Sequence, residues 1–200
     1  MPLNRRPRFR PRPESVIIDT MTQLDQLDDF YVTSDLWLGR SQILEIGKRT
    51  RWSSIEKMNQ ALIRSWNKVV GPEDHIVCLG NFAWDPMTAR NALDRLNGHI
   101  YFLKGSADDA LLEVHLEFEQ VSILEGDIIT VPQHDLVLSH YPLRMWAGQD
   151  SGTLHLHGHA IYSHETNLAL ERRFNMCTDN WGFSPIKLST LKDLLNEFKK

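Results

Sequence analysis

The sequence contains few cysteines and no long apolar segment. Cys78 and Cys177 are its two thiols. They are too few for a disulfide framework, and their strand-like surroundings predict buried thiols in a reducing compartment. The longest apolar runs are much shorter than the roughly 20 residues that cross a bilayer, so we expect no membrane partner. No apolar stretch follows the N-terminal arginines, so we do not expect secretion. The predicted location is the cytoplasm or an intracellular or virion assembly.

Acidic residues are absent from the first twelve positions. This stretch holds five arginines, namely Arg5, Arg6, Arg8, Arg10 and Arg12. The whole chain has a net charge of −4, of which these arginines contribute +5, so the remainder carries −9. A basic arm on an acidic body predicts that the arm has its own partner, either nucleic acid or an acidic protein surface. A solubilising tail is the other interpretation.

The chain as a whole has the composition of one soluble globular domain, with 42% hydrophobic and 24% charged residues. We assign residues 1–28 to the arm and its lead-in and residues 29–200 to the domain. Hydrophobic periodicity predicts strands at 29–35, 75–81, 99–105, 135–140, 153–159 and 172–177. It predicts helices within 53–70, 85–98, 110–119 and 188–200. Between the two groups, 121–131 is predicted as a hairpin about Gly126 and Asp127.

Polar residues at the helix ends predict where the helices begin. Ser53 and Glu56 have the spacing of a capping box at the start of the first long helix. Asp108 is expected to cap the helix that follows it, and Ser189 the last helix. Strands alternate with helices early and dominate later, which predicts an α/β sandwich whose strand-end loops converge on one edge. The loops expected there are 34–37, 79–82, 104–109, 138–143 and 157–161.

The order of motifs in these loops resembles that of the calcineurin-like metallophosphoesterases, in particular the small bacterial and phage-type members. The resemblance covers about residues 30–187 and extends to "EKMNQALIRSWNKVV", "RLNG", "SHYPLRMW", "HLHGH" and "NMCTDNWGFSPI". It implies an α/β/β/α sandwich of two packed mixed sheets flanked by helices. It also implies a two-metal site built from D-x-H, G-D, G-N-H-D, a lone His and G-H-x-H, in which the ions activate a hydroxide and clamp the phosphate.

Four positions of this chain correspond to metal ligands of the family. Three keep the family's residue type, and the fourth carries a weaker donor. Asp35 matches the first aspartate, His140 the lone histidine, and His159 the first histidine of G-H-x-H. Asn81 takes the place of the aspartate that bridges both metals, and so removes its charge. These four residues are the remaining candidates to hold a metal ion.

Four other family positions are lost. Trp37 replaces a histidine ligand, Ser106 an asparagine ligand, and Ile161 the last histidine of G-H-x-H. Ala107 replaces the histidine that helps to protonate the leaving group, so we expect no catalytic residue. An indole and a sec-butyl group at one site are typical of apolar repacking of a vacated cavity.

Together these changes predict a catalytically inactive member of the family with no cofactor. Its expected role is that of a structural or binding subunit of a larger, possibly nucleoprotein, assembly, which it joins through its surface and its basic arm. In one form of this hypothesis, the cleft is retained as a pocket that senses phosphate or a nucleotide. The alternative is a weak phosphodiesterase or phosphatase that holds one divalent ion, Mn or Zn, on Asp35, His140 and His159, with His164 as a substitute ligand.

Overall fold

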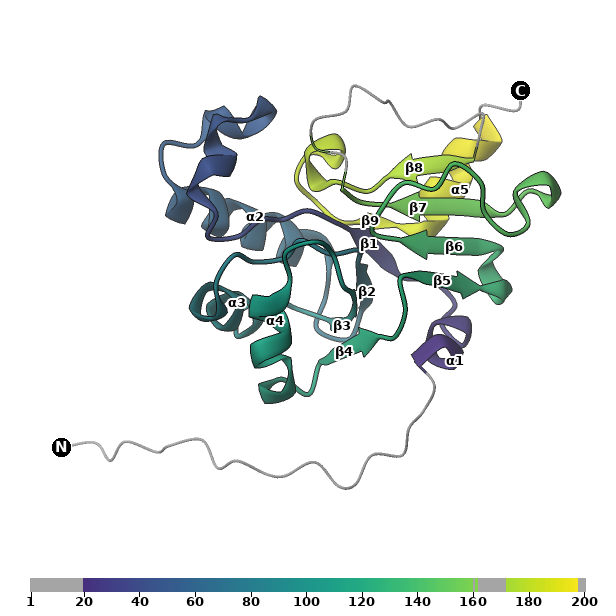
Figure 1. Ribbon diagram of the computed structural model, residues 1–200, viewed down its shortest axis with the longest axis horizontal. Coiled ribbons are helices and arrows are strands. Elements are labelled where there is room, and N and C mark those ends of the chain that lie inside the picture. The colour runs from purple at the N-terminus through teal and green to yellow at the C-terminus, as the bar shows by residue number, and fades with distance from the viewer. Residues whose placement is uncertain (1–19, 160, 162–171, 198–200) are drawn as a thin grey trace.

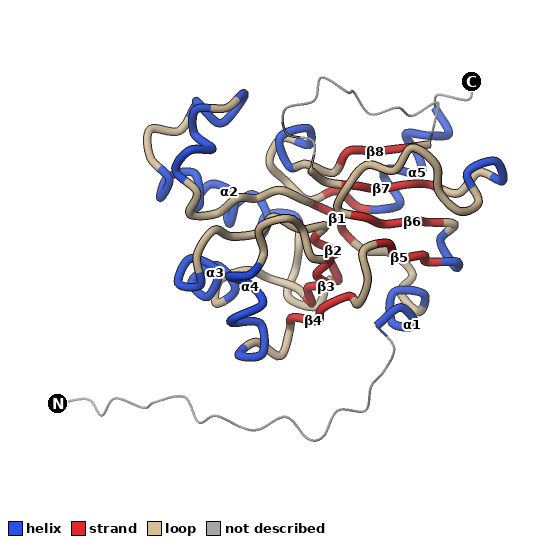
Figure 2. The backbone as a smooth tube through the Cα atoms, in the orientation of Figure 1, coloured by secondary structure: helices blue, strands red, loops and turns tan. Residues whose placement is uncertain are grey.

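The computed structural model describes residues 20–159, 161 and 172–197. The five arginines of the N-terminal arm and His164 lie outside the described residues. Figures 1 and 2 show strands in the middle of the molecule, with helices around them and loops collected at the strand ends. No helix of the described part is long and apolar enough to cross a membrane.

The strands form two mixed sheets. The first has the order β4-β3-β2-β1-β9 and the second the order β5-β6-β7-β8. The strands of the first sheet are β1 (Tyr31–Thr33), β2 (His75–Cys78), β3 (His99–Leu103), β4 (Val121–Leu124) and β9 (Ile186–Lys187). Those of the second are β5 (Ile128–Val131), β6 (Leu136–Ser139), β7 (Leu154–His157) and β8 (Arg173–Asn175).

Most neighbouring strands run parallel, and this directs their ends to the same edge. In the first sheet β1 to β4 are parallel to one another, and β9 is antiparallel to β1. In the second sheet β6, β7 and β8 are parallel, and β5 is antiparallel to β6. The carboxyl ends of β1, β2 and β3, and separately those of β6 and β7, therefore each lead into loops on one side of their sheet.

Helices cover the outer face of the first sheet. The α-helices are α1 (Thr20–Asp25), α2 (Ile55–Val69), α3 (Pro86–Leu93), α4 (Asp109–Val114) and α5 (Leu188–Glu197). Short 3-10 helices include Ser41–Glu45 and Gly47–Arg51. Buried residues of α2, α3 and α4 share one hydrophobic cluster with Ile76 and Cys78 of β2. Figure 1 shows these three helices on the side of the first sheet that faces away from the second.

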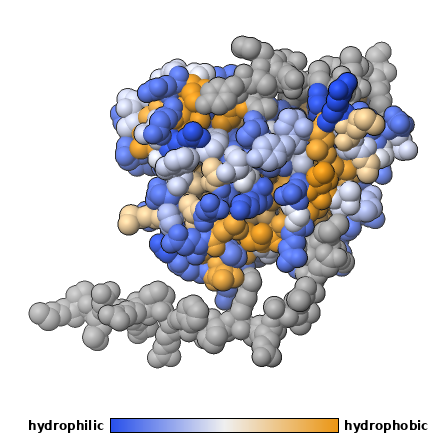
Figure 3. Space-filling model, viewed as in Figure 1, coloured by the Kyte–Doolittle hydropathy of each residue, from blue (hydrophilic) through white to orange (hydrophobic). Residues whose placement is uncertain are grey.

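A second hydrophobic cluster joins the two sheets. It contains Val77 of β2 and Leu103 of β3 from the first sheet, together with Leu138 of β6 and Leu156 of β7 from the second. Because side chains alternate across a strand, Val77 faces this cluster while its neighbours Ile76 and Cys78 face the helices. The α/β class predicted from the sequence is thus confirmed, as two mixed sheets with helices. Figure 3 shows a band of hydrophobic residues at the surface near β4 and β5.

The predicted hairpin about Gly126 and Asp127 is wrong. β4 pairs with β3 in the first sheet, whereas β5 pairs with β6 in the second, so this turn carries the chain between sheets. Gly126 has a φ of +117°, which glycine adopts without steric cost. Turn residues show that the chain changes direction, but they do not determine which strands pair.

Two helix starts also differ from the predictions. Ser54, not Ser53, caps α2, because its side chain accepts a hydrogen bond from the Lys57 N–H at 3.3 Å. At α5, Ser189 does not cap the helix; its N–H and hydroxyl donate to the carboxylate of Asp29, at 3.1 and 2.7 Å. Leu24 of α1 is fully buried in the second cluster, so the packed part of the chain begins before residue 29.

Candidate functional site

Glycines allow the strand-end loops to come into contact. A Cβ at Gly80, which has a φ of +95°, would lie 2.6 Å from the backbone of Gly105 and 2.8 Å from Nδ1 of His140. A Cβ at Gly158 would collide with the Ser34 hydroxyl and lie 2.8 Å from a carboxylate oxygen of Asp35. The loops after β2 and β3 therefore meet backbone to backbone, and side chains from the loops after β6 and β1 pack directly against Gly80 and Gly158.

The same loops concentrate unfavourable backbone conformations. Asp35, Trp37, Asn81 and His159 have φ values of +58°, +54°, +55° and +60°. They are four of the seven non-glycine residues with positive φ in the described part of the chain. Such conformations cost roughly 1–3 kcal/mol each, and they cluster at binding and catalytic sites, where the surrounding structure enforces them. A positive φ at a residue as bulky as tryptophan is a marked outlier.

Asp35 is buried, and its carboxylate accepts three hydrogen bonds. Oδ1 accepts from Nδ2 of Asn81 at 2.8 Å. Oδ2 accepts from the Ser34 hydroxyl and from the backbone N–H of His159, both at 2.8 Å. Charge-assisted bonds of this kind are roughly twice as strong as neutral ones. Asp35 therefore fastens the loop after β7 to the loops after β1 and β2.

Asn81 links the remaining polar groups of the site. Its Nδ2 donates to Asp35 and also lies 3.2 Å from Nε2 of His140. Its Oδ1 accepts a hydrogen bond from the Ser106 hydroxyl at 3.1 Å. An amide donates through nitrogen and accepts through oxygen, which a carboxylate at this position could not do. The amide thus connects Asp35, His140 and Ser106 in one network.

His140 and His159 lie side by side. Nδ1 of His140 is 2.7 Å from the carbonyl of Leu79, so it carries the ring proton and leaves Nε2 as an acceptor. Nε2 lies 3.1 Å from Nδ1 of His159, whose ring also packs on Tyr141 at 4.5 Å. Desolvation lowers the pKa of His159 and the neighbouring His140 lowers it further, whereas Asp35 raises it.

Asp108 organises the site, and sequence reasoning assigned it to the wrong role. It precedes α4 but makes no side-chain cap to that helix. Its carboxylate instead accepts backbone N–H groups of Asn81, Phe82 and Gly105, at 2.7, 2.8 and 2.6 Å. Burial raises the pKa of the Asp108 carboxyl, while these donors act in the opposite direction. The sequence feature that could have indicated this role is the position of Asp108 in a strand-end loop.

Arg49 is a second residue that the sequence did not reveal. It is fully buried, and its guanidinium donates to the carbonyls of Asp35 and Leu36 at 2.5 and 2.7 Å. It also pairs with the carboxylate of Asp179 at 2.6 Å. Arg49 therefore holds the loop after β1 against the segment after β8. Nothing in the basic run Lys48 to Arg51 distinguishes the buried arginine from the others.

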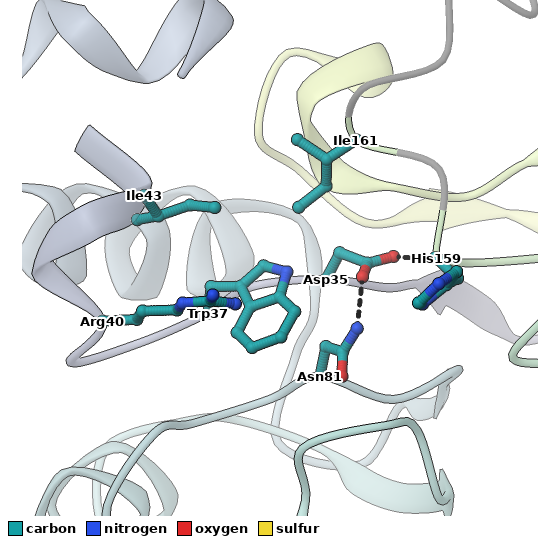
Figure 4. A pocket seen from close by; sticks show the side chains of 7 residues that line it. All are labelled: Asp35, Trp37, Arg40, Ile43, Asn81, His159 and Ile161. Atoms are coloured by element: carbon teal, nitrogen blue, oxygen red, sulfur yellow. Dashed lines mark hydrogen bonds between the residues drawn. The ribbon is translucent and has the colours of Figure 1, made fainter. Parts of the chain in front are cut away.

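A small cavity of about 80 Å³ lies beside Asp35. Its lining comprises Asp35, Trp37, Arg40, Ile43, Asn81, His159 and Ile161. Figure 4 shows Trp37 and Arg40 on one side of Asp35 and His159 on the other. Trp37 and Ile161, at the two positions where the resemblance would place histidine ligands, both line this cavity. Ala107 packs against the first hydrophobic cluster instead.

The residues present do not fit a two-metal centre. Three donors already engage the Asp35 carboxylate, and Nε2 of His140 faces Asn81 and His159. Where the resemblance would place a bridging carboxylate, Asn81 presents an NH₂ group to its neighbours. Within residues 20–159, 161 and 172–197, no three His, Cys, Asp or Glu side chains form a group that could hold a metal ion.

Comparisons with known proteins find relatives without an assigned function. No model of a known protein family matches the chain. It is 26% identical over 176 residues to the uncharacterized protein MJ1445 of Methanocaldococcus jannaschii, covering 84% of this chain and 92% of that protein. The crystal structure of the protein of unknown function AQ665 from Aquifex aeolicus is similar, with a TM-score of 0.64 and 20% identity. That likeness covers 83% of this chain and 98% of the other, and at this identity it shows the fold alone.

Proposed function

We propose that the chain is a metallophosphoesterase-like protein that does not hydrolyse phosphoesters and serves as a binding or structural subunit of a larger assembly. The observation that carries the proposal is the amide of Asn81, which donates to Asp35 and lies 3.2 Å from His140. The resemblance to the family places a bridging carboxylate at this position. A neutral NH₂ group cannot bridge two cations, and it satisfies the neighbouring acceptors directly.

The surroundings of Asn81 support the same proposal. Trp37 and Ile161 line the cavity where the family has histidine ligands, and Ala107 offers no proton to a leaving group. Hydrolysis of this type depends on a metal-activated hydroxide and on protonation of the leaving group. The two sheets that share one hydrophobic cluster are compatible with the family's α/β/β/α sandwich.

For the partner we propose a nucleic acid within a multi-subunit assembly in the cytoplasm or in a virion. The support is chemical: residues 1–12 hold five arginines and no acid, on a chain whose remainder is acidic. Arginine binds phosphate through paired N–H groups, and phosphate contacts provide most of the affinity of sequence-independent binding.

We expect no metal-dependent cleavage of bis-p-nitrophenyl phosphate, because the donor set supplies neither a bridging carboxylate nor a general acid. The wild type and a His140→Ala variant should both match the metal-only blank in Mn²⁺ and in Zn²⁺. Elemental analysis after dialysis against each ion should find no bound metal. Turnover that disappears in His140→Ala and Asp35→Ala would instead establish the weak single-metal phosphodiesterase.

Deletion of residues 1–13 is expected to weaken binding to nucleic acid and to make it less dependent on salt. Each arginine–phosphate contact that is lost should lower the slope of log K against log salt by about 0.9 for duplex DNA. Fluorescence anisotropy of a labelled duplex at several salt concentrations measures this. An Arg→Lys variant at the five arm positions retains the charge and serves as the matched control. An unchanged affinity and slope after the deletion would contradict the role of the arm.

A further inference from the structure

A stack of two tryptophans and one arginine adjoins the cavity. The guanidinium of Arg40 lies 4.3 Å from the ring centroid of Trp37 and 4.8 Å from that of Trp84. We call these three residues the tryptophan platform. The backbone N–H of Trp37 donates to the carbonyl of Asn81, and the backbone N–H of Trp84 to that of Leu38, at 2.9 and 2.8 Å. The platform is therefore held rigidly by the loops after β1 and β2.

Trp84 leaves a large part of its ring open to solvent. Its side chain is 50% exposed, although Arg40 and Trp37 pack against it. A rigid, half-exposed indole with a cation against it is the arrangement on which planar aromatic ligands stack. No carboxylate among the described residues lies within ion-pair distance of Arg40, so its charge is available to an anionic ligand.

Trp37 contributes an independent sign of a ligand. Its indole is 7% exposed, and its Nε1 has no hydrogen-bond partner. Figure 4 shows this nitrogen directed into the cavity, toward Asp35 and Ile161. A buried donor without a partner is energetically unfavourable, and such groups are rare in folded proteins. An acceptor oxygen of a bound molecule would satisfy it.

We propose that the tryptophan platform and the adjoining cavity bind one nucleotide of a single-stranded nucleic acid. The base stacks on the exposed part of Trp84, an oxygen of the nucleotide accepts from Nε1 of Trp37, and Arg40 faces the negative charge of the phosphate. Stacking on an aromatic residue requires an unpaired base, which a single strand offers and a duplex does not. This inference rests on the proposed nucleic-acid partner and names its form and its contact residues.

The test is the binding of a fluorescein-labelled oligothymidylate to the full chain, measured by anisotropy in EDTA. Base stacking contributes about 1–3 kcal/mol, so Trp84→Ala should weaken binding roughly 5- to 150-fold. Trp84→Phe retains an aromatic ring and should lose less binding affinity than Trp84→Ala. Trp37→Phe replaces the indole with a smaller ring that has no N–H donor, and it should weaken binding about fivefold. Trp52→Phe, a tryptophan that packs on Phe183 instead, is the matched control and should bind as the wild type does.

Three outcomes would overturn the inference: equal binding by the wild type and Trp84→Ala, equal binding of single strand and duplex, or no binding of any oligonucleotide. The last would point to a protein partner. These outcomes can be told apart from a failure of the proposed function. Cleavage of the phosphodiester would contradict the absence of activity, yet titration in EDTA would still report on Trp84. Likewise, if deletion of the arm does not change binding, the ratio of the oligonucleotide affinities of the wild type and Trp84→Ala still tests the platform.

Discussion

Replacing Arg49 by methionine is expected to lower the free energy of unfolding by about 3–5 kcal/mol, because it leaves a largely buried carboxylate without its partner. Arg49 is fully buried and donates to Asp179 at 2.6 Å and to the carbonyls of Asp35 and Leu36. Methionine retains much of the volume but none of the donors. Urea unfolding of the wild type and of the variant measures the difference.

The chain offers a matched control in Arg90. Its pair with Glu117 has the same 2.6 Å separation, but the two side chains are 43% and 45% exposed. Pairs open to solvent contribute about 0–1 kcal/mol, so Arg90→Met should unfold close to the wild type. A double variant, Arg49→Met with Asp179→Leu, should recover part of the loss because neither charge of the pair remains. Equal urea midpoints for Arg49→Met and Arg90→Met would refute this account of the buried pair.

The second large effect is a loss of stability in acid caused by His155. Burial on the outer face of the second sheet, together with the charges of His157 and Arg173, lowers the pKa of His155 from 6.5 to about 3. Its Nε2 lies 2.9 Å from the Ser139 hydroxyl, and the Trp146 ring covers it at 5.0 Å. A proton on this ring would be a buried charge next to other cations.

The direction in which stability changes with pH follows from the number of protons that the folded and unfolded states bind. Below pH 6.5 the unfolded chain protonates His155, whereas the folded chain does so only near pH 3. The unfolded state thus binds more protons in this window, so stability falls as the pH falls. At 1.36 kcal/mol per pH unit, the contribution lost between pH 7 and pH 4 is about 3 kcal/mol.

Urea unfolding at pH 7 and pH 4, in the wild type and in His155→Gln, isolates this contribution. Glutamine cannot take up the proton, so the variant should be less stable at pH 7 but should lose less stability in acid. The slopes of the two curves should differ by up to one proton. Parallel curves would mean that the folded chain protonates His155 as readily as the unfolded chain does.

Local patterns determined most of the elements of the fold. Short apolar runs placed β2, β3 and β6, alternation of leucine and histidine placed β7, and helical spacing placed α2, because these patterns depend only on neighbours along the chain. The sequence also indicated the loops of the site, since each polar residue of interest follows an apolar strand. Asp35, Asn81, His140 and His159 do lie together there.

Contacts between distant residues were decided only by the tertiary structure. β5 does not pair with β4 as the predicted hairpin requires, because it pairs with β6 in the second sheet. Asp108 does not cap its own helix because it accepts instead the backbone N–H groups of Asn81 and Phe82 in the loop after β2 and of Gly105 in its own loop. Arg49 is buried because Asp179, 130 residues away, supplies the compensating charge. Local sequence specifies which groups need a partner, but a partner far along the chain is chosen by the packing that brings both into one place.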